Sequence, residues 1–466
     1  MYNTLEQVFG YPQFRAGQEA VVSAVLAGRS AAAIFPTGSG KSLCYQLPAL
    51  LLPHLTLVVS PLLALMQDQL AFLQRHGIAA ASIDSAQSRE DASSVMARAK
   101  AGELKILMIS VERLKNERFR NFLQQVPISL LVVDEAHCIS EWGHNFRPDY
   151  LKLPDYQRQF NIPQALLLTA TATPNVIADM QTKFAIAEAD VITTGFYRAN
   201  LNLWVEPVSG AAKRQRLVQW MGARIGQPSI VYVTLQRTAE QIAEHLNQHG
   251  ISANAYHAGL PHEQRESIQR QFMGGQLNCI VATIAFGMGI DKSDIRNVVH
   301  FDLPKSIENY SQEIGRAGRD GQPSDCLVLA NRDSLNVLEN FVYGDTPELQ
   351  GIRCVLDELR EAMAEGQWEF MLLPLSDQSN IRQLPLKTLL VQLELRGLIA
   401  PRYAYFAEYR FKFLIEPELL LAKFEGGRQQ FVSAIIQTSS RARTWATVNF
   451  DTLYSQHQAD RNRVVK

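Results

Sequence analysis

An apolar run that leads into a glycine-rich turn is the feature that most constrains the fold of this chain. Residues 31 to 34 read Ala-Ala-Ala-Ile, which is typical of a buried strand, and Phe-Pro-Thr-Gly-Ser-Gly-Lys-Ser follows at 35 to 42. A strand that passes through such a turn into a helix directs the first amides of the helix at phosphate groups. The pattern predicts a phosphate-binding loop in which Lys41 pairs with phosphate and Ser42 binds magnesium. The loop comprises Thr37, Gly38, Ser39, Gly40, Lys41 and Ser42.

A second motif, Asp134-Glu135-Ala136-His137, closes the apolar run Leu130-Leu131-Val132-Val133. We expect Asp134 to hold magnesium together with Ser42, and Glu135 to act as a general base or to orient the attacking water. His137 is expected to relay contacts between domains rather than to bind a metal. The two motifs together predict a site that binds and hydrolyses a nucleoside triphosphate.

Short apolar runs alternate with amphipathic segments, which predicts an α/β fold with parallel sheets. After residues 195 to 198 the pattern restarts, so a second α/β domain is expected to begin near residue 200. Ligands bind such sheets at the carboxyl ends of their strands, which places the active site between the two domains. The candidate strands are Ala31 to Phe35, Leu55 to Ser60, Ile106 to Ser110, Leu130 to Asp134 and Ala165 to Thr169, then Ser229 to Val233, Cys279 to Thr283, Val298 to Asp302 and Cys326 to Ala330.

The second domain carries the arginine-rich stretch Gln-Glu-Ile-Gly-Arg-Ala-Gly-Arg-Asp at 312 to 320. If residues 311 to 319 form a helix, Gln312, Arg316 and Arg319 share one face. Two guanidinium groups there would neutralise the charge that develops as the terminal phosphate leaves, an effect worth roughly 10³ to 10⁵ in rate. A solvated basic helix is the alternative interpretation.

Composition limits the kinds of protein and ligand. The chain has 466 residues, 47% of them hydrophobic, and a net charge of −1, so a nucleic acid would be bound through local basic patches. No signal region opens the sequence, and no apolar stretch approaches the roughly 20 residues that span a bilayer. We therefore expect a cytoplasmic location, nucleoid-associated if bacterial, and no membrane partner. The five scattered cysteines are expected to be buried thiols.

Seven motifs together make the chain resemble a superfamily 2 helicase, and within that superfamily a RecQ-family DNA helicase. The resemblance covers residues 1 to about 330. Phe35 stands where the general phosphate-loop pattern has glycine, and the resemblance suggests a helicase-type variant of that loop. The motifs lie at residues 14 to 18 (Phe-Arg-Ala-Gly-Gln), 36 to 42, 59 to 69, 134 to 137, 168 to 173 (Leu-Thr-Ala-Thr-Ala-Thr), 281 to 291 and 312 to 320.

The resemblance implies two RecA-like motor domains that use ATP and Mg²⁺ to move 3′ to 5′ along single-stranded DNA and to unwind forked duplexes, in DNA repair or recombination. It also implies that Tyr11, Arg15 and Gln18 receive adenine, although from the residues alone domain packing explains them as well. Protein partners are unknown. An RNA helicase, a translocase that does not unwind, and a binding or annealing scaffold with an inactive motor are the alternatives.

Residues 138 to 148 resemble the aromatic-rich loop of RecQ helicases. There Trp142 and Phe146 would stack on unpaired bases, and Arg147 would contact phosphate or an aromatic ring; a buried Trp and Phe are the alternative. Hydroxyl and imidazole groups near predicted strand ends would contact the DNA backbone, or cap the following helix. These further DNA-binding candidates are Ser60, Pro61, Thr171, His257 and Thr283.

Beyond residue 330 the resemblance weakens. Cys354 and His457 cannot build the four-ligand zinc module of many RecQ proteins, so no zinc is expected. Apolar packing would instead orient a helical connector through Leu335, Leu338, Phe341, Val355, Leu356 and Leu359.

A helix from Leu386 that stops at Gly397, followed by alternation from Tyr403 to Ile415, suggests a winged helix. Its aromatic residues Tyr403, Tyr405 and Phe406 would wedge at a DNA fork or, equally, pack the domain. Tyr409, Phe411, Phe413 and Ile415 are expected to face its core, with Arg410 and Lys412 outward.

The end of the chain, residues 439 to 466, is a basic segment with five Arg or Lys and two Asp, and suggests a truncated further domain. Five segments are therefore predicted. The motor domains cover residues 1–199 and 200–332, the connector 333–375, the winged helix 376–438 and the basic tail 439–466.

Overall fold

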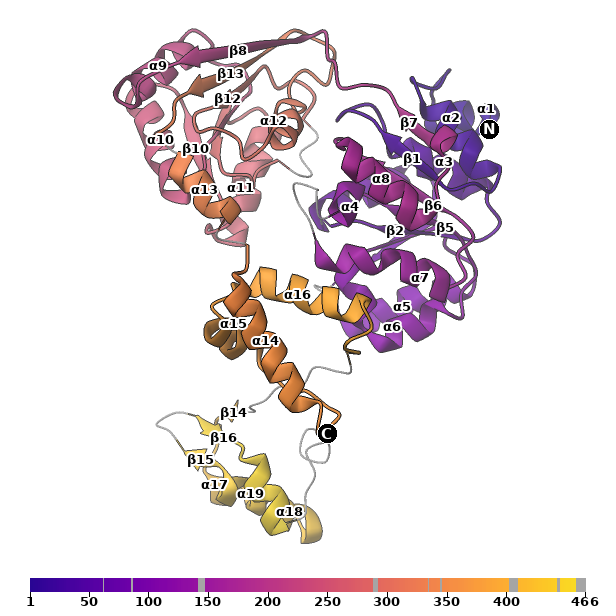
Figure 1. Ribbon diagram of the computed structural model, residues 1–466, viewed down its shortest axis with the longest axis vertical. Helices are drawn as coiled ribbons and strands as arrows, with labels where there is room; N and C mark the ends of the chain where they lie inside the picture. The colour runs from indigo at the N-terminus through magenta and orange to yellow at the C-terminus, as the bar shows by residue number, and fades with distance from the viewer. Residues whose placement is uncertain are drawn as a thin grey trace. The chain divides into compact units, whose positions relative to one another are not determined.

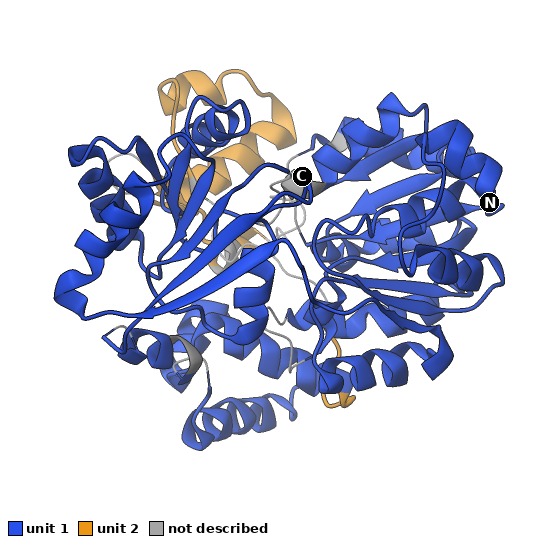
Figure 2. Ribbon diagram, turned by 90° about the horizontal axis from the view of Figure 1, so that it is seen from above, with its two compact units in different colours: residues 1–395 blue, residues 396–466 orange. Residues whose placement is uncertain are grey.

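The computed structural model describes residues 1–61, 63–84, 87–140, 147–287, 292–333, 335–343, 346–401, 410–441 and 445–457. The chain divides into two compact units, residues 1–395 and 396–466, which Figure 2 shows in blue and orange.

A parallel sheet of seven strands forms the centre of the first motor domain (Figure 1), in the order β3-β4-β2-β5-β6-β1-β7. Every residue of its interior strands is buried, as expected for a parallel sheet that helices cover on both faces. The strands are β1 (Ala31–Ile34), β2 (Leu55–Val59), β3 (Ala80–Ile83), β4 (Ile106–Ile109), β5 (Ile128–Val133), β6 (Ala165–Thr169) and β7 (Val191–Thr193).

Two apolar clusters cover the two faces of this sheet. Leu57 and Leu131 belong to one cluster and their neighbours Val58 and Val132 to the other, because successive side chains of a strand point to opposite faces. The helices are α1 (Tyr2–Phe9), α2 (Gln18–Leu26), α3 (Leu43–Leu51), α4 (Leu63–Arg75), α5 (Arg89–Lys100), α6 (Glu117–Leu123), α7 (Leu153–Gln159) and α8 (Pro174–Phe184), and the 3₁₀ turns are η1 (Val111–Lys115), η2 (Ala136–Ile139), η3 (Pro148–Lys152) and η4 (Glu188–Asp190).

The second motor domain has a parallel sheet of six strands in the order β10-β11-β9-β12-β13-β8. Its edge strand β8 (Leu201–Pro207) pairs with β13 (Ser324–Ala330) and exposes Leu203, Trp204 and Val205 by 56, 49 and 65%. The other strands are β9 (Ser229–Tyr232), β10 (Ala253–Tyr256), β11 (Cys279–Ala282) and β12 (Asn297–His300), and the helices are α9 (Gly210–Gly222), α10 (Gln236–Gln248), α11 (His262–Met273) and α12 (Ile307–Ile314).

The two sheets confirm the predicted tandem α/β fold. All nine candidate strands exist, as β1, β2, β4, β5, β6, β9, β11, β12 and β13, with ends that agree within about two residues. The sequence analysis missed β3, β7, β8 and β10, which are the four edge strands of the two sheets.

Four helices follow the second sheet: α13 (Leu335–Tyr343), α14 (Leu349–Ala362), α15 (Leu372–Ser379) and α16 (Gln383–Leu395). An apolar cluster of Val355, Leu375, Ile381 and Leu386 joins the last three. Of the predicted connector residues, Val355 and Leu338 are buried, whereas Leu335 is 38% exposed. The predicted helix through Leu386 is α16, and Gly397 adopts φ +70° just beyond its end.

Within its described residues, unit 2 contains a small antiparallel sheet in the order β14-β16-β15 and three helices. Tyr403, Tyr405, Phe406 and Tyr409 lie outside the described residues, so the wedge and the winged helix stay predictions. The expectation that Ile415 faces a core is wrong, because β14 ends at Phe411 and Ile415 is 37% exposed just before the helix that starts at Pro417. The elements are β14 (Arg410–Phe411), β15 (Ser440–Arg441), β16 (Ala446–Thr447), α17 (Pro417–Leu421), α18 (Gly426–Thr438) and α19 (Phe450–His457).

Among the residues that the structure describes, none of the helices combines the length and apolar character needed to cross a membrane. The five cysteines are free thiols; four are buried, as predicted, whereas Cys354 is half-buried.

Candidate nucleotide-binding and active site

The predicted phosphate loop connects β1 to α3 through a turn that needs two glycines. Gly38 and Gly40 adopt φ +85° and +78°, a region that side chains with a Cβ rarely occupy. Nζ of Lys41 donates to the carbonyl oxygens of Phe35, at 2.9 Å, and Pro36, at 3.2 Å. The ammonium group is therefore held inside the curve of the loop.

Phe35, the departure from the general loop pattern, is a core residue. Its side chain is fully buried in the apolar cluster of β1 and α3, and its ring lies against Gly17. A Cβ at Gly17 would lie 2.8 Å from the Phe35 ring and 2.7 Å from Cγ2 of Thr194. The residue before Pro36 thus packs the domain and leaves phosphate binding to the residues after it.

Two side chains support the loop: Arg15, just before α2, and Gln18, the first residue of α2. Arg15 Nη1 donates to the carbonyl of Gly38 at 2.9 Å, and Gln18 Nε2 donates to the carbonyls of Ser39 and Gly40 at 3.1 and 3.0 Å. The structure therefore brings two of the three predicted adenine residues to the loop. Tyr11, the third, is 43% exposed.

Two acidic side chains follow β5. Asp134 accepts hydrogen bonds from Ser60 Oγ at 3.3 Å and from the amide of Glu135 at 3.0 Å. Glu135 has φ +49°, a strained conformation for a residue with a side chain, and strain of this kind is often found at functional sites. Its Oε2 is buried without a hydrogen bond, although Nδ1 of His137 lies 3.4 Å away.

Burial dominates the electrostatics of these groups. It raises the pKa of Asp134 to about 7, with repulsion from Glu135 acting in the same direction, and it also raises the pKa of Glu135. Burial lowers the pKa of Lys41 against the opposing pull of both carboxylates, and it lowers the pKa of His137 to about 4. His137 is therefore neutral near pH 7, and its Nδ1 pairs with Thr169 Oγ1 at 2.9 Å, within the first domain.

The donor set at this site fits magnesium. Ser42 Oγ and the Asp134 carboxylate are hard oxygen ligands, and Mg²⁺ is usually held by one or two carboxylates together with substrate phosphates. Gln69, from the motif at 59 to 69, donates to Ser42 Oγ at 2.9 Å and orients the hydroxyl. Within the described ranges no group of three or more His, Cys, Asp or Glu side chains could hold a metal ion, and the absence of zinc stays a prediction.

The arginine-rich stretch differs from the prediction in one respect. Helix α12 ends at Ile314, so Arg316 and Arg319 lie in turns and share no helical face with Gln312. Gly315, the C-cap of the helix, lies close to the phosphate loop: a Cβ at Gly315 would lie 3.2 Å from Cβ of Thr37. The turn, rather than a helix face, carries the two guanidinium groups.

The structure nevertheless brings this turn to the phosphate loop. A Cβ at Gly38 would lie 3.3 Å from Cγ of Arg319, and Arg316 favours the charged form of Glu135. Arg316 is 5% exposed and donates to the carbonyl of Gly287. A side chain larger than glycine at position 287 would collide with the guanidinium group of Arg316. Gln312 is buried, at 8% exposure, on the last turn of α12.

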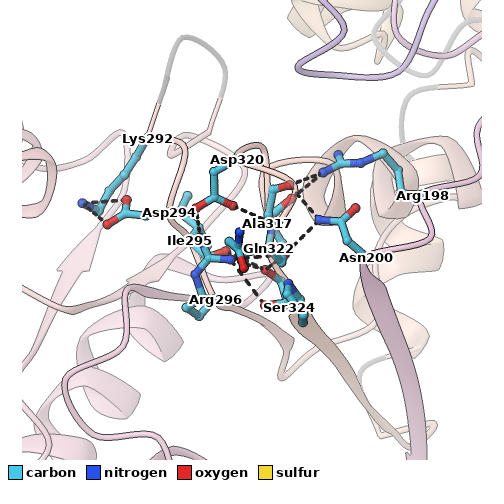
Figure 3. Close-up of polar contacts among 12 residues, drawn as sticks. Arg198, Asn200, Lys292, Asp294, Ile295, Arg296, Ala317, Asp320, Gln322 and Ser324 are labelled. Atoms are coloured by element: carbon cyan, nitrogen blue, oxygen red, sulfur yellow. Dashed lines mark hydrogen bonds and ion pairs between the residues drawn. The ribbon is translucent and has the colours of Figure 1, made fainter.

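Polar contacts fix the far side of this turn (Figure 3). Arg296 donates to the carbonyls of Gln322 and Pro323 and to Ser324 Oγ, and it pairs with Asp320. The amide of Gly318 donates to the carbonyl of Ile295 at 2.9 Å. Arg296 was missed in the sequence because a single arginine between strands has no motif to mark it.

The DNA-binding candidates are mostly enclosed. The side chains of Ser60, Thr171, His257 and Thr283 are 2, 4, 4 and 9% exposed, and Pro61 is partly exposed. Ser60 is engaged with Asp134, Thr283 Oγ1 accepts from the amide of Ala285, and His257 pairs with Glu240.

Of the aromatic-rich loop at 138 to 148, residues 138–140 and 147–148 are described. Trp142 and Phe146 lie outside the described residues, whereas Arg147 is 36% exposed with Nη1 3.7 Å from Oε1 of Glu112.

Comparison with known proteins finds that the chain matches two protein-family models and is similar in sequence to several proteins. Residues 15–180 match the DEAD/DEAH box helicase family, and residues 212–321 match the helicase conserved C-terminal domain. The chain is 42% identical over 327 residues to the ATP-dependent DNA helicase RecQ of Pasteurella multocida, which covers 70% of this chain and 51% of that protein. It is 39% identical over 363 residues to the probable ATP-dependent DNA helicase RecS of Bacillus subtilis. That alignment covers 78% of this chain and 73% of RecS.

The chain spans between half and two thirds of the RecQ proteins that it matches in Pasteurella, Haemophilus and Bacillus. Among solved structures, Dbp5 of S. cerevisiae bound to RNA and ADP BeF3 is similar with a TM-score of 0.58 and 20% identity, over 73% of this chain and 90% of that one. At this identity the likeness shows only the shared fold of two tandem α/β domains.

Proposed function

Since this chain belongs to the RecQ family of helicases, we propose that it hydrolyses ATP to move 3′ to 5′ along single-stranded DNA and to unwind duplexes ahead of it. The proposal extends to a role in DNA repair or recombination. Binding of forked duplex DNA and a cytoplasmic location stay predictions.

The contact of Arg319 with Gly38 is the observation that supports this proposal best. It brings a guanidinium group of the second domain to a loop of the first that already holds Lys41 close to Asp134 and Glu135. Charge of both signs is thus gathered around one turn, as transfer of a phosphoryl group to water requires.

In the proposed reaction Lys41 and the loop amides bind the β- and γ-phosphates of ATP, and Ser42 and Asp134 hold magnesium. Magnesium bound there supplies positive charge to the phosphate oxygens. Glu135 orients the attacking water and accepts its proton, a role that suits a buried carboxylate with a raised pKa and an unpaired oxygen. Arg316 and Arg319 stabilise the charge that develops on the transferred phosphoryl group, with Gln312 beside them.

We propose that Tyr11, Arg15 and Gln18 form the adenine side of the site. Because Arg15 and Gln18 bond the loop carbonyls, nucleotide binding and loop position would be linked through these two side chains. On the DNA side, Arg147 near the end of the aromatic-rich loop is the candidate phosphate contact, and Trp142 and Phe146 are the candidates for stacking on unpaired bases.

ATP turnover tests the proposal directly. We would compare no nucleic acid, single-stranded DNA, duplex DNA and RNA at one fixed salt concentration, since phosphate contacts are salt-dependent. Stimulation by single-stranded DNA is expected. Stimulation by RNA alone would point to an RNA helicase, and no turnover under any condition would point to a scaffold with an inactive motor.

A loop variant and a strand-displacement assay complete the test. Lys41→Ala should abolish turnover while DNA binding persists, whereas Lys100→Ala, on the exposed surface of α5, should leave turnover unchanged. Duplexes with a 3′ or a 5′ single-stranded tail then test polarity, and the 3′-tailed substrate should be unwound. Turnover without displacement of either strand would indicate a translocase that does not unwind.

A further inference from the structure

The segment 194–200, which links β7 of the first sheet to β8 of the second, is hydrogen-bonded to the turn that carries Arg316 and Arg319. Arg198 provides this contact (Figure 3): Nη2 donates to the carbonyls of Ala317 at 2.9 Å and Gly318 at 2.7 Å, and Nη1 donates to the carbonyl of Gly315 at 3.3 Å. A guanidinium group has five N–H donors in a fixed plane, so it can hold three carbonyl oxygens at once.

These carbonyls lie just beyond the end of α12. The last carbonyls of a helix have no intrahelical donor, and a cation close to them is favoured by the helix dipole. Helix α12 ends at Ile314, and Arg198 reaches the carbonyl oxygen of the very next residue, Gly315. Arg198 therefore acts as a cap supplied from the linker.

A second linker side chain bonds the same turn. Asn200 Nδ2 donates to the carbonyls of Gly318 at 2.8 Å and Gln322 at 2.9 Å. Gly318 adopts φ +54°, and a Cβ there would collide with the amide group of Asn200. The linker thus contacts the backbone directly between Arg316 and Arg319.

We propose that Arg198, aided by Asn200, is a positioning residue that couples the interdomain linker to the two arginines of the nucleotide site. The inference rests on the proposed function, because it assigns the arginines to ATP hydrolysis. A change in the path of the linker would move the carbonyls of residues 315–318 and with them both guanidinium groups. The Arg296 contacts lie within the second domain, so they hold the turn without transmitting the position of the linker.

Two measurements on Arg198→Ala test the proposal. The kcat of DNA-stimulated ATP hydrolysis should fall at least tenfold while the KM for ATP changes less than threefold, because the arginines act on the transition state. Hydrogen exchange of the amides of residues 315–321 should become faster, with or without nucleotide. Arg198→Lys should restore only part of kcat, since an ammonium group lacks the planar fork that reaches three carbonyls.

Arg216→Ala is the matched control. Arg216 makes a two-bond ion pair with Glu206 on the same domain, at 2.6 and 2.7 Å, and has no contact with the turn among the described residues. It should leave kcat and exchange at residues 315–321 unchanged.

Two outcomes would overturn the proposal: unchanged exchange at residues 315–321 in Arg198→Ala, or an equal loss of kcat in Arg216→Ala. Failure of the proposed function would differ from both, since the wild-type chain itself would then not hydrolyse ATP, while the exchange result would still report on the turn.

Discussion

Nε2 of His300 lies 2.7 Å from Oε2 of Glu313, and both side chains are buried in the second motor domain. The pair joins the end of β12 to α12, and the ring of Tyr232 stacks on His300 at 5.5 Å. Removing one member of a buried pair leaves the other without compensation. Because Glu313 stands between Gln312 and Arg316, the pair also anchors the segment that we assign to hydrolysis.

Glu313→Ala should therefore destabilise the chain by about 3 kcal/mol, and Glu313→Gln by less because the amide still bonds the imidazole. Urea denaturation measures both. The matched control is Glu266→Ala, which removes an exposed His–Glu pair whose atoms lie 3.6 Å apart and should cost no more than about 0.5 kcal/mol. Equal losses in the two variants would show that the buried pair adds nothing.

Glu135→Gln should slow ATP hydrolysis by roughly 10² to 10⁴, the usual worth of a general base, while ATP still binds. Single-turnover hydrolysis and the binding of a fluorescent ATP analogue measure the two effects separately. Glu117→Gln, on the first turn of α6, serves as the control and should match the wild type. A variant that loses binding and hydrolysis together would instead indicate a role for Glu135 in holding nucleotide.

Burial of Asp134 makes the contribution of this residue to the stability of the chain depend on pH. Its pKa is about 7 in the folded chain and about 3.9 when unfolded, so the unfolded state releases its proton first as pH rises. Its contribution to stability thus falls between about pH 4 and pH 7, by up to about 1.4 kcal/mol per pH unit, and is constant above pH 7.

The Tm of Asp134→Asn minus that of the wild type should therefore grow from pH 4 to pH 7 and then level off, without nucleotide or metal. Asp155→Asn, at a carboxylate that is 54% exposed, should give a difference that changes little with pH. Parallel curves for the wild type and Asp134→Asn would refute the assignment.

Gly17→Ala should destabilise the first domain through two effects. The residue has φ +78°, and its Cβ would meet the Phe35 ring and Thr194 at less than 3.0 Å. Gly28→Ala separates these effects, since Gly28 has φ +80° and no atom within 4 Å of a Cβ. We expect about 1 kcal/mol for Gly28→Ala and an additional 1–3 kcal/mol for Gly17→Ala, measured by chemical denaturation. Equal effects would mean that the contact relaxes freely.

The sequence predicted the interior strands of both sheets. Runs such as Leu130-Leu131-Val132-Val133 form interior strands that are apolar on both faces, and each of them was predicted. The four edge strands were missed because one side of such a strand has no neighbour: β10 reads Ala-Asn-Ala-Tyr, and β8 leaves Leu203, Trp204 and Val205 exposed.

The site was predictable to the extent that its residues lie in contiguous motifs. The turn at Arg316 and Arg319 was predicted as helix. The approach of Thr37 to Gly315 has no signal in the local sequence, because the two residues are far apart in the chain. Arg198 and Arg296 bind backbone carbonyls, and a carbonyl has no side-chain pattern from which its partner can be inferred.

The pairing of β8 with β13 has a consequence for how the chain folds during its synthesis. The two strands begin at Leu201 and Ser324, so a ribosome that adds 5 to 20 residues per second needs on the order of ten seconds to supply the partner of β8. During that interval a nascent chain presents an unpaired strand with Leu203, Trp204 and Val205 on it, next to a first domain that is already complete. Chaperones that recognise extended apolar segments are thus expected to meet this strand first, and shielding it during synthesis should raise the yield of folded protein.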